Sequence, residues 1–165
     1  MNYYVYLKNL HDTKWEPFEK SFEEGDNNFL EAYLYSFAVC KNDSVTKDKT
    51  VGFYLDYWSS EGIKCPLQKI TYMAEYRDVY MSIKTGVINA DNRLSSQSRD
   101  LEALIAALYL SDIPNVMMPY LIFIVKKYID SGENDTGLIE ILRFLVAFHV
   151  RRKSKPISFK HFDIR

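Results

Sequence analysis

The sequence predicts an all-α protein, a single compact bundle of about six or seven helices. Its apolar residues recur at spacings of three and four along most of the chain, which is typical of helices that bury one face. Glycine and proline are scarce, at 6 and 5 residues, and they fall between the periodic segments. Alternation typical of a strand is confined to Tyr3, Val5 and Leu7. A chain of 165 residues is long enough for one domain that buries roughly 70% of its unfolded surface.

The first half of the chain predicts three helices, over Thr13–Glu24, Asn28–Lys41 and Thr46–Ser59. The first begins at a threonine, a favoured N-cap residue. Gly25 and Gly62 follow the first and third segments, and they mark where these helices end. The apolar residues that line one face of each helix are Trp15, Phe18 and Phe22; Leu30, Tyr33, Leu34, Phe37 and Ala38; and Val51, Tyr54, Leu55 and Trp58.

The second half predicts four helices, over Pro66–Lys84, Ser98–Ser111, Val116–Asp130 and Thr136–Arg152, with a loop at Asn89–Gln97. The longest begins at a proline, which suits the first helical position. The last is a clean amphipathic helix with a basic end. Its predicted inward residues are Leu138, Ile141, Leu142, Leu145, Phe148 and His149.

Val116–Asp130 is apolar almost all round, and we therefore predict that it is the central buried helix. Pro119 must then lie in its first turn, where the missing amide hydrogen is tolerated. The apolar-rich stretch Val116–Val125 is only ten residues long. Since about 20 residues are needed to cross a bilayer, it predicts a core element and not a membrane helix.

The composition indicates a cytoplasmic protein. The net charge is -1, so no overall field draws the chain to nucleic acid or to a membrane. The first residues lack a basic stretch followed by an apolar one, and we expect no secretory signal. The two cysteines, Cys40 and Cys65, are interpreted as reduced and buried.

No catalytic, cofactor or metal motif is spelled out in the sequence. The glycines are isolated, and neither a Cys-x-x-Cys nor a His-x-x-x-His pair occurs. We interpret His149 as a partly buried imidazole with a hydrogen-bond partner. An enzyme would need a site assembled from scattered residues such as His149, Arg77 and Glu75. The prediction is a non-catalytic chain with no cofactor and no metal.

Two features suggest binding. Basic residues gather near the C-terminus, at Arg151, Arg152, Lys153 and Lys155. These residues are either a patch that contacts the phosphates of nucleic acid, or cations that are favoured at a helix C-terminus and continue into a solvated tail. We predict a helical domain over 1–153 and a basic C-terminal tail over 154–165. Tyrosines also recur every four residues, at Tyr72, Tyr76 and Tyr80. That stripe is either a helix–helix contact or a binding platform.

Several stretches in this order resemble the helical middle region of GmrSD-like restriction proteins. They are Asn28–Leu30 with Ala32–Leu34, Ile70–Tyr80, Met118–Ile124 and Gly137–Arg152. In that family the helices lie between a ParB-like nucleotide-hydrolysing domain and an HNH-type nuclease domain. The Asp-Gly-Gln-Gln-Arg-type motif of the first does not occur here, and the chain ends where the second would begin.

The resemblance implies a non-catalytic helical domain of an anti-phage restriction protein, which connects or scaffolds adjacent catalytic modules and contacts DNA. Only Arg151 and Arg152 match a family motif, so no catalytic residue is carried over. The alternative is a small cytoplasmic protein-binding inhibitor, such as a toxin-neutralising immunity protein. The 13 tyrosines favour that alternative, because tyrosine is enriched at the centres of protein interfaces.

Overall fold

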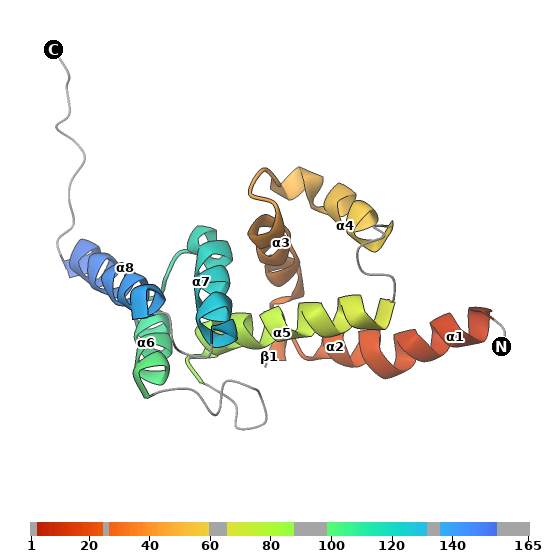
Figure 1. Cartoon of the computed structure of the whole chain (residues 1–165), viewed down its shortest axis with the longest axis horizontal. Helices are drawn as coiled ribbons and strands as arrows, with labels where there is room; N and C mark the ends of the chain where they lie inside the picture. The colour runs from red at the N-terminus through yellow and green to blue at the C-terminus, as the bar shows by residue number, and fades with distance from the viewer. Residues whose placement is uncertain (1–2, 25–26, 60–65, 88–98, 132–135, 155–165) are drawn as a thin grey trace, which may run out of the picture.

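The computed structural model describes residues 3–24, 27–59, 66–87, 99–131 and 136–154 (Figure 1). These residues are almost entirely helical, and the all-α prediction is confirmed. Each of the seven predicted segments contains a helix. The helices are α1 (Tyr3–Leu10), a π-helical turn (His11–Trp15), α2 (Glu16–Lys20), α3 (Leu30–Lys41), α4 (Thr50–Ser59), α5 (Pro66–Thr85), α6 (Arg99–Leu110), α7 (Met118–Asp130) and α8 (Thr136–Ser154). Short 3-10 turns, Lys47–Lys49 and Asn115–Met117, precede α4 and α7, and the two-residue strands β1 (Glu23–Glu24) and β2 (Asn27–Asn28) pair antiparallel.

The N-terminal segment is a helix, and the strand-like interpretation of Tyr3, Val5 and Leu7 is wrong. Helix α1 runs through the π-helical turn into α2. Its half-buried side chains are Tyr6 and Leu10, four residues apart, as expected for one helical face. An alternation of three residues is too short to outweigh this pattern, because a strand also needs a partner to satisfy its backbone.

Helix α5 lies in the middle of the molecule (Figure 1). Helices α3, α6 and α7 pack against it, and so does the π-helical turn between α1 and α2. Buried residues occur every three or four positions from Lys69 to Ile83, so α5 packs against its neighbours over most of its length. The large apolar and aromatic members are Ile70, Met73, Tyr76, Val79, Tyr80 and Ile83. The tyrosine stripe is thus an interhelical contact: Tyr76 and Tyr80 meet rings of α3.

Helix α7 has a buried face and an exposed one. Leu121, Ile122 and Val125 are completely buried, and α7 packs on α3, α5 and α8. Its proline lies in the first turn, as its place in a helix requires. Tyr120 and Phe123 are nevertheless exposed, so the prediction of a helix buried all round is wrong. An apolar composition alone does not distinguish a helix with neighbours on every side from one with an apolar outer surface.

A buried ammonium group closes the end of α4. Lys69 of α5 is almost completely buried, and its Nζ donates hydrogen bonds to the carbonyl oxygens of Tyr57 and Trp58, at 2.6 and 2.8 Å. These carbonyls lie in the last turn of α4, where no helical amide reaches them. The charge also suits the negative end of the helix dipole. Lys69 is therefore a structural residue that joins α5 to α4.

Gly86, which follows α5, is required for the shape of the turn there. Its φ is +73°, and a Cβ at this position would lie 2.7 Å from Cδ1 of Tyr109. We expect Gly86→Ala to lower the free energy of unfolding by at least about 1–2 kcal/mol, because the left-handed conformation disfavours a Cβ and Tyr109 must move to admit it. Urea denaturation followed by circular dichroism would measure the change.

Gly52 provides the matched control for that substitution. It lies within α4, and a Cβ there would meet nothing within 4 Å. Gly52→Ala is therefore expected to raise stability by about 0.5–1 kcal/mol, since alanine favours the helix interior. A similar effect from both substitutions would contradict the conformational argument for Gly86.

Candidate functional site

The predicted basic residues lie at the exposed C-terminal end of α8. Arg151, Arg152 and Lys153 occupy its last turn, and their side chains are exposed. Lys153 lies 3.3 Å from a carboxylate oxygen of Asp112, in the turn after α6. Lys155 lies outside the described residues. The structure thus places three of the four cations together, and one of them is partly neutralised by a neighbour.

His149 fixes the orientation of this helix. It is buried, and its Nε2–H donates to the carbonyl oxygen of Ser111 at 3.1 Å, as predicted for an imidazole with a hydrogen-bond partner. Leu138, Ile139 and Leu142 are buried on the same helix. These contacts hold one face of α8 against α6 and α7.

A second face of α8 is apolar and exposed. Phe144 and Phe148 are 67% and 53% exposed, and Ile141 is exposed beside them. The two phenyl rings stack on each other, with centroids 6.2 Å apart and planes 22° apart. We call Ile141, Phe144 and Phe148 the α8 outer face. Helix α8 itself lies at the opposite end of the molecule from α1 (Figure 1).

Ile141 and Phe148 were predicted to point inward, and that prediction is wrong. Helix α8 carries two apolar stripes, one through Leu138, Leu142 and His149 and the other through the α8 outer face. Both stripes have spacings of three and four, so periodicity alone does not say which of them meets the core. The sequence does contain one signal of the second stripe: Phe144, a large aromatic residue, lies beside the charged residues Glu140 and Arg143.

A second polar cluster lies between α3, α5 and α7. Lys41 donates hydrogen bonds to the hydroxyls of Tyr72 and Tyr76, the latter at 2.6 Å, and its Nζ lies 3.9 Å from the Tyr76 ring centroid. Lys126 lies on the other side, 3.3 Å from a carboxylate oxygen of Glu75 and 5.7 Å from the Tyr76 ring centroid. These contacts link three helices through their polar atoms.

The chemistry of this cluster is structural. Burial raises the pKa of the Tyr76 hydroxyl well above its ordinary value of 10.0, and the hydrogen bond with Tyr72 adds to the shift. The phenol therefore stays protonated and is unsuited to act as a base. Cations over aromatic faces add electrostatic attraction to the hydrogen bonds. We interpret the cluster as a link that fixes α3 and α7 on α5.

The scattered residues considered for catalysis have different partners. Glu75 pairs with Lys126, Arg77 pairs with Asp78, and His149 bonds the Ser111 carbonyl. Burial raises the pKa of the Cys40 thiol, which favours the unreactive neutral form. Cys65 lies outside the described residues.

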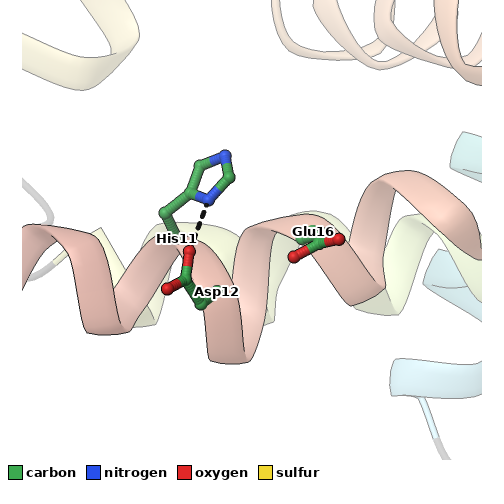
Figure 2. A group of neighbouring side chains, drawn as sticks. All are labelled: His11, Asp12 and Glu16. Carbon is green, nitrogen blue, oxygen red and sulfur yellow. Dashed lines mark hydrogen bonds and ion pairs between the residues drawn. The ribbon is translucent and has the colours of Figure 1, made fainter.

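A third polar group lies near the start of the chain. Of the residues that the structure describes, His11, Asp12 and Glu16 bring together three side chains with metal-binding atoms, all within 4.8 Å of one another (Figure 2). The first two belong to the π-helical turn, and Glu16 is the first residue of α2. Sequence reasoning missed the group because it searched for histidine and cysteine pairs at helical spacing.

Comparison with known proteins gives no relative: no family model matches the chain, and searches of curated proteins and solved structures found no match. The resemblance to the helical region of GmrSD-like proteins therefore stays a prediction. Of the helices that the structure describes, none is long and apolar enough to cross a membrane.

Proposed function

We propose that this chain is a non-catalytic binding domain that docks on a protein partner through the α8 outer face. The observation that carries the proposal is the stacked pair Phe144 and Phe148, which is exposed on a helix that packs against the core through another face. Exposed aromatic groups of this kind are typical of binding sites, because their removal from water supplies much of the affinity of an interface.

The arrangement of α8 indicates what the partner presents. Ile141, Phe144 and Phe148 have the spacing with which a helix inserts its anchors into an apolar groove. Arg151 and Arg152 follow Phe148 by about one turn, and their side chains make the C-terminal end of the docking surface positively charged. A groove bordered by carboxylates at one end is therefore the complementary surface.

Both functions inferred from the sequence use such a surface. A connecting domain of a restriction protein would dock on adjacent catalytic modules, and an inhibitor would dock on its target. Direct contact with DNA is the second candidate, and it depends on the exposed Arg151 and Arg152. It has weaker support, because Lys153 already has Asp112 as a neighbour and a stacked phenylalanine pair adds nothing to phosphate binding.

The test is cross-linking from a chosen position. A photoreactive residue at position 148 is expected to give an adduct with one protein in the cells that make this chain. The matched control is position 55 in α4, where Leu55 is 68% exposed. With the partner purified, Phe144→Ser combined with Phe148→Ser should weaken binding at least about 30-fold, the loss of one interface hot spot. Val51→Ser combined with Leu55→Ser should leave the affinity unchanged.

Two results would refute protein docking. One is the same set of adducts from positions 148 and 55. The other is salt-sensitive binding to duplex DNA that Arg151→Ala with Arg152→Ala abolishes and the double phenylalanine variant retains. The substituted residues are exposed, so an unchanged thermal unfolding midpoint would show that each variant is folded.

A further inference from the structure

The π-helical turn His11–Trp15 places residues five apart on one side of the chain. The Glu16 amide donates to the His11 carbonyl oxygen, the hydrogen bond that defines such a turn. In an α-helix, side chains five residues apart point about 140° away from each other. The wider turn removes most of this difference, so His11 and Glu16 share a face only because of the local backbone. Such turns are frequent at functional sites.

The side chains on this face offer a nitrogen donor and two carboxylates. His11 Nδ1 lies 3.0 Å from Asp12 Oδ1, and the donor atoms of His11, Asp12 and Glu16 all lie within 4.8 Å of one another. Figure 2 shows the imidazole over the Asp12 carboxylate, with Glu16 on the next turn of the ribbon. The group is accessible, since His11 and Asp12 are exposed.

We propose that the π-helical turn is a binding site for a divalent cation of the zinc class. Zinc binds imidazole nitrogen and carboxylate oxygen at about 2.0–2.2 Å, and small side-chain rotations would bring the three donors to that distance. Two carboxylates and a neutral imidazole balance the charge of the ion, and water would complete the coordination. Nitrogen with oxygen donors also favours this class over magnesium and calcium, which prefer oxygen alone.

One neighbouring cation competes for the same site. Lys20 Nζ lies 2.7 Å from a carboxylate oxygen of Glu16, an exposed pair four residues apart on the helix. Such pairs are weak in water, and a divalent ion that binds two further ligands displaces the ammonium. Lys20 therefore lowers the affinity of the site without closing it.

Occupation of the site would stiffen the junction between α1 and α2. The π-helical turn packs on α5, and Trp15 at its end lies 6.1 Å from Trp58 and 5.5 Å from Phe18, measured between ring centroids. An ion held by His11 and Asp12 at the start of the turn and by Glu16 after it would restrict the orientation of α1 relative to the part of the turn that packs on α5. The inference is independent of the function proposed for α8.

The test is titration of the full chain with Zn²⁺ by isothermal calorimetry. We expect one equivalent to bind, with an affinity at least about tenfold lower in His11→Ala and in Glu16→Gln, because each removes one of three ligands. Glu19→Gln, which removes a nearby carboxylate outside the group, should bind like the original chain. Lys20→Gln should bind more tightly, since it removes the competing ammonium.

The same series contains the results that would overturn the site. Absence of binding to the original chain is one, and equal affinity in His11→Ala, Glu16→Gln and Glu19→Gln is another. Binding that survives His11→Ala and disappears in His161→Ala would place the ion at the other end of the chain. Circular dichroism of each variant without zinc would show that the helices are intact.

Discussion

Replacement of Tyr33 by alanine is expected to lower the free energy of unfolding by about 3–5 kcal/mol. Tyr33 is completely buried on α3, and four rings surround it: Phe22 at 4.7 Å, Tyr80 at 5.5 Å, and Phe18 and Phe37 at 6.0 Å, measured between centroids. It joins α2, α3 and α5 at one point. Removal of the ring would leave a cavity that these neighbours fill only in part, and urea denaturation would measure the loss.

Two tyrosine-to-phenylalanine variants separate the ring of Tyr33 from its hydroxyl. The Tyr33 hydroxyl donates to the Met73 carbonyl oxygen at 2.5 Å, so Tyr33→Phe should cost about 1 kcal/mol. The buried hydroxyl of Tyr80 has no hydrogen-bond partner among the described residues. Tyr80→Phe should therefore cost nothing or increase stability, since it removes a polar group that burial deprives of water. Equal costs for the two variants would contradict this account of the core.

The positions of most helices could be predicted from the sequence, because their apolar residues recur every three or four residues between glycine and proline. In α3 the predicted inward residues Tyr33, Phe37 and Ala38 are buried, and proline is in the first turns of α5 and α7 as its chemistry requires. The same spacing did not settle burial everywhere, because Val51 and Leu55 on the predicted face of α4 are exposed and α7 is apolar on its outer side as well.

The candidate sites could not be predicted in the same way. Helix α8 has two apolar stripes, and the choice between them depends on tertiary contacts such as the bond from His149 to Ser111, 38 residues away. The π-helical turn adds a residue to one turn of the helix, and the spacing of Trp15 and Phe18 is compatible with an ordinary helix too. His11 and Glu16 therefore looked unrelated in the sequence and become neighbours only in the folded chain.

Stability is also expected to fall steeply between pH 10 and pH 12. Burial raises the pKa of Tyr57 and of Tyr80 from 10.0 to about 12, and it raises those of Tyr33, Tyr54 and Tyr76 well above 10.0. In the unfolded chain these phenols ionise near pH 10, whereas in the folded chain they keep their protons. The unfolded state thus binds fewer protons in this range, and the free energy of unfolding decreases as the pH rises.

The urea midpoint, measured in steps from neutral pH to pH 12, would test this expectation. It should be nearly constant up to about pH 9 and then fall. Lysines also lose their charge in this pH range, so the difference between the original chain and Tyr80→Phe measures the contribution of the Tyr80 phenol alone. Each proton that the folded chain retains changes the free energy of unfolding by up to about 1.4 kcal/mol per pH unit. The free energy of unfolding of Tyr80→Phe should therefore fall less steeply with pH, by up to this amount. If the variant has the same pH dependence as the original chain, the pKa of Tyr80 in the folded protein is close to its value in the unfolded chain. Water would then reach the Tyr80 hydroxyl, contrary to what the packing of α3 against α5 implies.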